Sequence, residues 1–584
     1  MGRATFQRGR SAASLLPGAW VVALTGLLTA PMLMPGFVLS YDMVFTPKQD
    51  LLPASLGLGG GLPRAVPQDA VVALLEYVVP GMVLQKLVLL AIPLLTGFGM
   101  LRLLQGLGRA VGLVGATLAM LAPFVAERLV MGHWGLLLAY AIAPWAIDAA
   151  RRARSLSAPS WSGQWPVAVT LLLLIAGSSL TPSGAILVTL LAVPIAIGPG
   201  SGLSIWMRIF IAVGAAATWL PWLIPALLHV QDGSADADGA RVFALRSEGD
   251  WGTVLTALGS GGIWNAEVVP PSRTLIIAPL AALLVVALAV FGARLLWKGL
   301  GRAVALWWCA VALVGLAGAL LSTTQAWGVL VSSLPGAGLL RDAHKLLAPL
   351  ALLLAAAAGA GVVHLARRLP DRLASRSIVV AALLLPLLLQ PDVLWGAGGR
   401  LRPVDYPASW QAMRDEVAES APGDVLVLPW TAFRRYEWNS ERTVLDPAPR
   451  WLTRTALVAD GLLVQTPEGV VRVSGDDPRA EAVSAALDQG RDLREVLPAL
   501  GVGWVLLDGP GTLPQGLTAA WSDQGLILAR VPGAIVDLPP PPGWSLVLGV
   551  DLLLAILLGA GVTAALGARV RDANRRRHGE SLLG

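Results

Sequence analysis

The chain has 584 residues, of which 55% are hydrophobic and only 14% carry a charge. Soluble domains average about 25% charged residues, so this composition excludes a water-soluble globular protein and indicates one that crosses a membrane many times. The net charge of +6 does not indicate nucleic-acid binding, because most arginines lie in short segments between apolar runs, where membrane topology accounts for them. The single cysteine, Cys309, excludes an intramolecular disulfide and a cysteine-based metal site.

The first apolar run, 13–34, follows three arginines near the N-terminus. It is longer than the apolar core of a typical signal peptide and has no clear small-x-small cleavage site, which favours a retained signal-anchor helix over a cleaved signal peptide. A spanning helix needs about 20 apolar residues. We predict twelve spans, in chain order 13–34, 82–104, 109–126, 133–150, 165–180, 184–200, 205–229, 274–293, 303–321, 345–366, 377–395 and 544–567.

The basic residues set the orientation of these spans. If the N-terminus is cytoplasmic, every second connection should be cytoplasmic and rich in Lys or Arg. The sequence follows this rule, so we predict a multi-pass plasma-membrane protein with both termini in the cytoplasm. The basic residues concerned are Arg102, Arg109, Arg151, Arg152, Arg154, Arg208, Arg294, Lys298, Arg302, Arg367, Arg368, Arg372, Arg376, Arg569, Arg571, Arg575, Arg576 and Arg577.

Three long segments are predicted to lie outside. The first, 35–81, contains an apolar stretch at 66–79 that is typical of a helix lying along the membrane surface. The second, 230–273, carries a polar acidic run at 231–239 that we expect to form a mobile loop. The third has the composition of a soluble domain. The predicted organisation is a transmembrane region at 1–395, an extracytoplasmic domain at 396–543, and a last helix with a basic cytoplasmic tail at 544–584.

The pattern of the outer domain predicts an α/β fold. Stretches with helical periodicity alternate with short apolar runs of the kind that form buried strands. The predicted fold class is therefore a polytopic α-helical membrane protein with an extracytoplasmic α/β domain before its last helix. The predicted helices of the domain are 410–420, 478–487 and 492–500, and its predicted strands are 424–429, 502–507 and 526–531.

Residues that could perform chemistry lie at the outer ends of predicted helices. Asp42, Lys48 and Asp50 follow the first span, where a carboxylate loses hydration and needs a partner or a function. Asp42 could instead cap a helix or pair with Lys48. Because all such residues lie on the outer side, one outward-facing cavity could collect them.

Two further groups lie at the same level. Glu127, Arg128 and His133 join the third and fourth spans; the first two could instead be a snorkelling pair, and the histidine, beside Trp134, could belong to an interfacial aromatic belt. The last group, Arg341, Asp342, His344 and Lys345, places three potential cations on the outer side, against the positive-inside bias. Snorkelling accounts for one of them, whereas three together favour an anion such as a phosphate.

The segment 430–438 of the outer domain is rich in aromatic residues and arginine. It could stack on sugars or pack the domain onto the membrane region, and the second interpretation is favoured. The sequence contains no Walker phosphate loop, no His-Glu-x-x-His zinc helix and no Gly-x-Ser-x-Gly nucleophile turn.

Three segments resemble motifs of the GT-C superfamily of membrane glycosyltransferases. Ser40-Tyr41-Asp42 lies just after the first helix, as does the catalytic Asp or Glu of that superfamily. The run from Glu127 to Trp134, followed by Tyr140 and Pro144, resembles an Arg…Gly-His…Pro pattern. The run from Leu334 to Asp342 is similar to a Pro-Gly…Phe-Arg-Asp/Glu segment, and 501–504 is similar to the outer domain of that group. The excess of Arg over Lys suggests a GC-rich genome, and the chain most resembles actinobacterial integral membrane proteins and the membrane half of mycobacterial arabinofuranosyltransferases.

This resemblance implies transfer of a sugar, with inversion, from a polyprenyl-phosphate donor to an envelope glycan or lipid on the outer face. It implies Asp42 as the catalytic base, with Asp50 as the alternative base or as a ligand of a divalent cation if one is used; no other cofactor is expected. Membrane lipids are expected partners and nucleic acid is not. The residues expected to bind substrate or phosphate are Lys48, Asp50, Glu127, Arg128, His133, Arg341, Asp342, His344 and Lys345.

The chain departs from the superfamily pattern in two places. Asp42 has no acidic neighbour, and Leu340 stands where an aromatic residue is common. Two other functions stay open at this point. One is a lipid or glycan transporter or flippase, which fits twelve spans but not the lack of repeated hydropathy between halves and of midplane charges. The other is a non-catalytic envelope-assembly protein whose outer domain binds a partner or a glycan.

Overall fold

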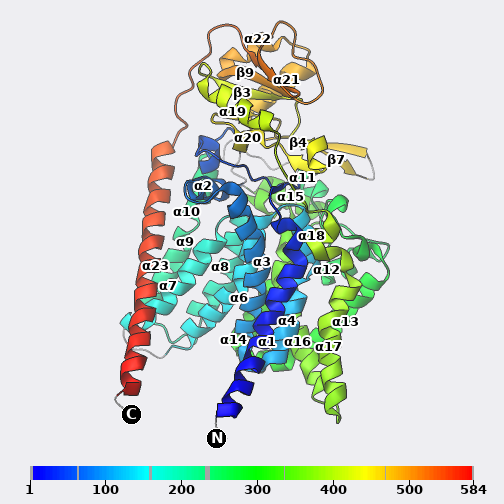
Figure 1. Ribbon diagram of the computed structural model, residues 1–584, viewed down its shortest axis with the longest axis vertical. Coiled ribbons are helices and arrows are strands. Elements are labelled where there is room, and N and C mark those ends of the chain that lie inside the picture. The colour runs from blue at the N-terminus through cyan, green and yellow to red at the C-terminus, as the bar shows by residue number, and fades with distance from the viewer. Residues whose placement is uncertain are drawn as a thin grey trace.

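The computed structural model describes residues 4–61, 65–156, 161–229, 237–334, 336–466 and 469–581, so most of the acidic run 231–239 lies outside the described residues. A large helical region carries a smaller unit with sheets at one end (Figure 1). Helix α1 (Ala4–Thr29) begins, and helix α23 (Trp544–Ser581) ends, at the opposite end of the helical region (Figure 1). Both ends of the chain are therefore on the side away from the sheets.

Eight helices among the described residues are long and apolar enough to cross a membrane, with α4 and α5 counted together. Each of the twelve predicted spans coincides with a helix or a pair of helices, but the count of twelve stays a prediction. Helices α9 and α10 form one apolar segment bent by 52°, and α7 and α8 are shorter. The remaining bounds in this region are α2 (Gln68–Leu75), α3 (Gly81–Leu103), α4 (Arg109–Met120), α5 (Pro123–Val130), α6 (Trp134–Arg154), α7 (Trp161–Ser178), α8 (Pro182–Ile197), α9 (Ile205–Ala217), α10 (Leu220–Leu228), α11 (Ala237–Val242), α12 (Gly252–Leu258), α13 (Ile277–Leu300), α14 (Arg302–Leu321), α15 (Gln325–Ser333), α16 (Ala348–Ala366) and α17 (Arg372–Leu389).

Helix α16 forms the centre of the helical region. In the most apolar part of the span that contains α16, 83% of the residues are buried. The corresponding share is 0% in α17 and 6% in α23. Close backbone contact makes this possible: a Cβ on Gly361 of α16 would collide with the Leu288 carbonyl and the Gly292 nitrogen of α13. Small residues at helix crossings are typical of membrane proteins, where tight packing replaces the hydrophobic effect as the source of stability.

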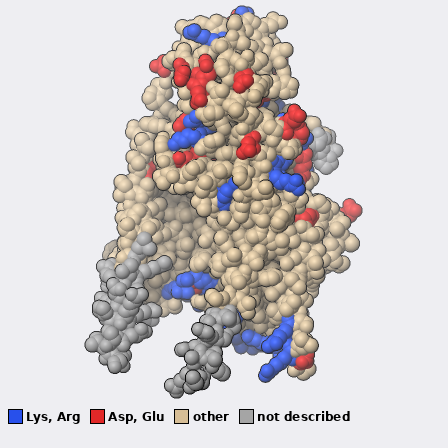
Figure 2. Space-filling model, viewed as in Figure 1, with Lys and Arg blue, Asp and Glu red and all other residues tan. Residues whose placement is uncertain are grey.

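The charged residues on one face of the molecule gather toward its two ends, with a broad belt of other residues between them (Figure 2). Exposed apolar side chains, among them Val290, Leu313 and Leu388, lie on α13, α14 and α17. A surface of this kind is expected where lipid chains replace water.

One predicted span ends earlier than expected. The run 377–395 was predicted as helix, but α17 stops at Leu389 because Pro391 cannot continue it. The chain then forms α18 (Leu394–Gly399), in which Trp395, Gly396, Ala397 and Gly398 all have positive φ, between 53° and 67°. These four residues make a turn of left-handed helix, which costs a non-glycine residue about 1–2 kcal/mol.

The sheet unit is built around a five-stranded sheet in the order β10-β11-β9-β3-β6. Strand β3 (Asp424–Leu428) runs parallel to β9 (Val502–Asp508) and to β6 (Ala456–Leu457), and β11 (Leu526–Arg530) runs antiparallel to β9 and β10 (Thr518–Asp523). Trp410 of α19 (Ala408–Glu419) packs on one face, and Val483 of α21 (Pro478–Asp488) on the other. The unit also contains β7 (Leu462–Thr466), β8 (Gly469–Val473), α20 (Ala448–Trp451) and α22 (Leu493–Val496).

The predicted α/β elements of this unit are present. The strands and helices expected at 410–420, 424–429, 478–487, 502–507 and 526–531 are confirmed within one or two residues. The helix expected at 492–500 is instead split, because Pro498 starts a separate 3-10 turn after α22. The predicted domain boundaries and the outer location of the unit stay predictions.

The sheet unit is joined to the helical region by the segment after α1. Strand β1 (Phe37–Val38) pairs with β2 (Pro403–Val404), and Tyr41 exchanges backbone hydrogen bonds with β5 (Thr443–Leu445), the partner of β4 (Phe433–Arg435). Two ion pairs, Arg414–Asp50 and Arg450–Asp69, add to this junction. The predicted helix at 66–79 is α2, and its Asp69 faces the sheet unit.

Aromatic residues fill the space under α19. Trp438 stacks on Tyr436 with ring centroids 4.7 Å apart and lies 5.1 Å from Tyr406, which in turn contacts Phe37 from the segment after α1. The ring centre of Phe433 lies 6.3 Å from that of Tyr41, and Arg435 pairs with Glu267 at 3.5 Å, so the segment 430–438 packs against the helical region, as one of its two interpretations predicted.

Candidate functional site

Asp42 lies in a tight turn between the helical region and the sheet unit. Its N–H donates to the Met131 carbonyl at 3.1 Å, and the Met43 N–H donates to the Ser40 carbonyl at 2.9 Å. The preceding Tyr41 has a φ of 46°, a strained value for a tyrosine, and is held by the Thr443 carbonyl at 2.7 Å. Elements from both parts of the molecule thus fix the position of Asp42.

Gly132 allows this turn to approach the loop between α5 and α6. Its φ is +84°, and a Cβ at this position would collide with the Met43 nitrogen and the Ser40 carbonyl. A glycine is needed here for conformation and for space together.

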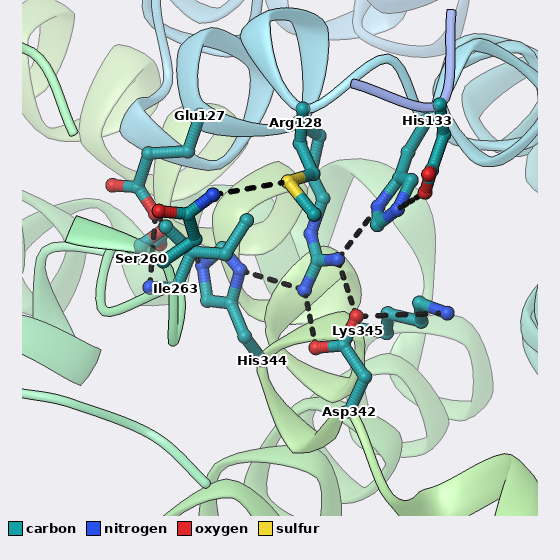
Figure 3. Close-up of polar contacts among 11 residues, drawn as sticks. Glu127, Arg128, His133, Ser260, Ile263, Asp342, His344 and Lys345 are labelled. Atoms are coloured by element: carbon teal, nitrogen blue, oxygen red, sulfur yellow. Dashed lines mark hydrogen bonds and ion pairs between the residues drawn. The ribbon is translucent and has the colours of Figure 1, made fainter. Parts of the chain in front are cut away.

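Asp42 is the exposed end of a chain of polar contacts that runs through His133 to the buried Arg128. Figure 3 shows His133, Arg128, Asp342 and His344 of this chain. Oδ2 of Asp42 lies 2.8 Å from Nε2 of His133, and Nδ1 of the same ring lies 2.8 Å from Nη1 of Arg128. A guanidinium can only donate, so Nδ1 of His133 accepts and its Nε2–H donates to Asp42. The ring is therefore a neutral imidazole that orients one oxygen of the Asp42 carboxylate.

Arg128 is the centre of the cluster and is fully buried. Nη1 and Nη2 donate to the two oxygens of Asp342 at 2.5 and 2.7 Å, a bidentate ion pair. Nη2 also lies 2.9 Å from Nδ1 of His344, so by the same reasoning His344 is a neutral ring with its proton on Nε2. One arginine thus sets the tautomer of two histidines.

Glu127 lies on the far side of His344, away from Asp42. Its Oε2 accepts the Ile263 N–H at 3.1 Å and is 3.5 Å from Nε2 of His344, which also lies 3.4 Å from the Ser260 carbonyl (Figure 3). Glu127 therefore fixes the loop 260–263 against α5 and does not face solvent.

A second buried carboxylate lies beside Glu127. Glu248 accepts from the Gly262 N–H at 2.7 Å and pairs with Arg273 at 2.7 Å. A Cβ on Gly261 would touch both carboxyl groups, so they converge on that glycine. Sequence reasoning did not select Glu248, because nothing in its local sequence indicates burial.

The electrostatics separate the roles of these groups. Partial burial opposes ionisation of the Asp42 carboxyl, but the hydrogen bond from His133 and the charge of Lys345 hold its pKa below the usual value. Although Asp342 is also buried, Arg128 and Lys345 hold the pKa of its carboxyl well below its usual range.

Exposure distinguishes the two ends of the cluster. The Asp42 side chain is 37% exposed and that of Lys345 28%, whereas Asp342 is 12% exposed and Arg128 is completely covered. Lys345 Nζ lies 3.6 Å from Asp342. The surface of the cluster therefore presents a carboxylate and an ammonium group, and the ion pair below them supports both.

Three predicted site residues lie elsewhere. Lys48 Nζ lies 3.5 Å from the centre of the Tyr77 ring, and Asp50 pairs with Arg414 at 2.5 Å. The Arg341 guanidinium lies over the Phe243 ring, 4.6 Å from its centre. Asp50 thus serves the junction with the sheet unit, to which Lys48 contributes its carbonyl oxygen, 3.0 Å from Arg414. Arg341 packs on Phe243.

The surface roles considered for Glu127, Arg128, Asp42 and His133 do not fit their contacts. Glu127 and Arg128 are not a snorkelling pair, because both are fully buried and each binds other partners. Asp42 does not pair with Lys48 but with His133. His133 makes specific polar contacts on both ring nitrogens, which an interfacial aromatic belt does not require.

A divalent cation would need several oxygen ligands that are not already paired. In the described ranges, no three His, Cys, Asp or Glu side chains come together in a way that could hold a metal ion. Asp50, the predicted alternative ligand, has its carboxylate against Arg414. These side chains do not form a prebuilt metal site.

No family model and no curated protein matches the sequence. Among solved structures, the chain is similar to a cryo-EM structure of the arabinofuranosyltransferase AftD from Mycobacteria, with a TM-score of 0.53 and 16% sequence identity. The similarity covers 90% of this chain and 42% of that chain. The two chains share a fold. Together with the apolar helices, this identifies a multi-pass membrane protein.

The Arg128–Asp342 ion pair should be essential for stability. Replacing Arg128 with Met leaves the buried Asp342 without its bidentate partner, and loss of one member of a buried pair costs about 3–5 kcal/mol. We expect Arg128→Met to unfold at a clearly lower temperature, measured by tryptophan fluorescence in detergent. The control is Arg472→Met, which removes an exposed pair with Asp488 and should change little. Equal unfolding temperatures for both variants would contradict the assignment.

Gly132→Ala should loosen the Asp42 turn. The added methyl group displaces Met43 and Ser40, so the amides of Asp42 and Met43 should exchange with deuterium at least about tenfold faster, as expected if local opening becomes easier. Peptide-resolved hydrogen exchange measures this. Gly301→Ala is the matched control, since Gly301 has a φ of +91° but open space around it. Unchanged protection of 40–45 in Gly132→Ala would show that the turn does not depend on this contact.

Proposed function

We propose that this protein is a membrane glycosyltransferase that moves a sugar from a polyprenyl-phosphate donor to a cell-envelope glycan or lipid. The observation that carries the proposal is the arrangement of Asp42: a carboxylate at a protein surface, with one oxygen fixed by a neutral histidine and a buried ion pair behind it. The GT-C-like fold supports it, because AftD, which shares this fold, is an arabinofuranosyltransferase.

Asp42 is the proposed general base. The acceptor hydroxyl attacks the anomeric carbon, its proton passes to the free oxygen of Asp42, and the bond from the anomeric carbon to the phosphate oxygen breaks with its electron pair on the phosphate. Displacement from the opposite face inverts the anomeric centre. A carboxylate with a lowered pKa is ionised throughout the physiological range and can take the proton once attack has made the hydroxyl acidic.

Lys345 is the proposed electrophilic partner. Its ammonium group is partly exposed beside Asp342, and a cation there would stabilise the negative charge that develops on the leaving phosphate. Of the three cations that the sequence indicated for this role, His344 is neutral and buried in its contact with Arg128, and Arg341 lies over Phe243. We therefore assign the role to Lys345 alone.

In this proposal His133 and Arg128 are positioning residues. His133 holds the Asp42 carboxylate, and Arg128 holds His133 in the tautomer that can donate to it. The proposed orientation places the sheet unit and Asp42 on the outer side of the membrane and both termini in the cytoplasm. It follows the distribution of basic residues between the spans.

Asp42→Asn should abolish most transfer without unfolding the protein. Asn keeps the shape and can still accept the His133 N–H through its amide oxygen, but it cannot take a proton. Loss of a general base typically lowers the rate by about 10²–10⁴-fold. Turnover of a radiolabelled polyprenyl-phosphate sugar by the purified chain in lipid vesicles measures this, with Asp50→Asn as the control. Normal turnover by Asp42→Asn would exclude this residue as the base.

The pH dependence of transfer should report on His133. Asp42 must be ionised, so transfer is lost as the pH falls through its lowered pKa. His133→Leu removes a hydrogen bond to the charged form, worth about 1.5–3 kcal/mol, and should raise this acidic limb by about one to two pH units.

His133→Gln is the conservative counterpart, because its amide can donate to Asp42 and accept from Arg128. Its acidic limb should stay close to that of the wild type. A purely structural histidine would lower the rate at every pH without moving the limb, and that result would contradict the positioning role.

A further inference from the structure

Two cavities lie behind the Asp42 turn and meet at Arg400. The first, about 270 Å³, has five charged residues in its lining, Glu267, Arg400, Arg435, Glu441 and Arg442, beside Tyr41. The second, about 240 Å³, is mainly apolar; its lining includes Ala126, Pro270, Pro271, Val393 and Ala397. It also includes Asp392, whose carboxylate accepts hydrogen bonds from the N–H and the hydroxyl of Ser272, both at 2.6 Å. Val130 and Arg400 line both. A polar cup and an apolar slot thus share a wall and have an arginine at the junction.

The polar cup has an excess of positive charge. Arg400, Arg435 and Arg442 face two carboxylates, and one of these, Glu267, is occupied by the Tyr41 hydroxyl at 2.5 Å and by Arg435 at 3.5 Å. Arg442 donates only to carbonyl oxygens, including those of Arg400 at 3.0 Å and Arg402 at 2.7 Å.

The charge of Arg442 therefore has no carboxylate partner among the described residues. One nitrogen of Arg400 donates to the Glu267 carbonyl, and its other guanidinium nitrogens make no hydrogen bond within the described part of the chain. Guanidinium groups in this state favour an anion with several acceptor oxygens.

The backbone that carries Arg400 is strained. It follows the left-handed turn of α18, where Trp395 and Ala397 have φ of 56° and 53° without being glycine. Ala397 and Gly398 of this turn line the apolar slot. Strain of this kind persists only where the surroundings impose it, and it is frequent at ligand-binding sites.

The apolar slot lies next to surfaces suited to lipid. Val393 comes just after α17, which is not buried, and Leu388 near the end of that helix is 74% exposed. Pro271 comes just before α13, where Leu275 and Ile276 are 56% and 73% exposed. Exposed apolar side chains at the ends of α13 and α17 thus lie close in sequence to residues that line the slot.

We propose that the two cavities form one binding site for a lipid phosphate, with the phosphate in the arginine cup and the start of the lipid chain in the apolar slot. Arg400, at the junction, contacts the phosphate. The two cavities have none of Asp42, His133 and Arg128 in their lining, and the existence of the site does not depend on the proposed transfer reaction.

Binding of dioleoyl phosphatidic acid to the full-length chain in detergent, followed by native mass spectrometry, tests the proposal. Dioleoylglycerol has the same chains without the phosphate, and inorganic phosphate has the anion without the chains. Both should bind at least about tenfold more weakly than the phosphatidic acid, since a charge-assisted contact is worth roughly tenfold or more in affinity. Equal binding of either one would overturn the proposal.

Variants locate the site. Arg400→Gln and Arg435→Gln should each weaken phosphatidic acid binding about tenfold, and Val393→Phe, which fills the slot, should weaken it as well. The controls are Arg530→Gln on β11 and Val562→Phe on α23, which make the same changes at exposed positions. Undiminished binding by Arg435→Gln and Val393→Phe would overturn the site even if Arg400→Gln failed to fold. Asp42→Asn should bind normally, which separates this test from that of sugar transfer.

Discussion

The contact on which the site depends is the bidentate ion pair of Arg128 with Asp342. Burying a guanidinium is costly unless every part of its charge is matched. Asp342 supplies the negative charge, and the ring nitrogens of His133 and His344 supply two more acceptors. Because an arginine cannot accept a hydrogen bond, this arrangement forces both histidines to be neutral and to keep their protons on the far nitrogens. The hydrogen bond from Arg128 to Nδ1 of His133 therefore sets the direction of the hydrogen bond between His133 and Asp42.

The second constraint is the position of the Asp42 turn between two parts of the molecule. Gly132 brings the turn against the loop after α5, and β5 holds Tyr41 from the opposite side. The sheet unit is therefore part of the scaffold of the candidate site, since it supplies the strand that fixes Tyr41. Asp50 and Lys48, which lie on the same segment as Asp42, contribute at the junction and not at the site.

Much of the fold could be predicted from the sequence, because apolar runs of sufficient length and the alternation of basic connections are local signals. The proximity of Asp42, His133 and Asp342 could be predicted, because all three lie at the outer ends of predicted helices and in segments that resemble motifs of one family. The different fates of Arg341 and Lys345 could not be predicted, since side-chain direction depends on neighbours such as Phe243 that are distant in sequence. The left-handed turn at 395–398 could not be predicted either, because the apolar sequence before it is typical of a spanning helix.

The protonation states of His133 and His344 can be measured on the intact protein in lipid. They show whether Arg128 keeps both rings neutral, with the proton on the nitrogen that faces away from it. The chain has five histidines, so selective ¹⁵N labelling gives a spectrum that His133→Gln and His344→Gln variants can assign. We predict that both rings are neutral with the proton on Nε2 and that the His133 signal does not change between pH 8 and pH 6. A charged His133 ring at pH 6, or a proton on Nδ1 of either ring, would contradict the account.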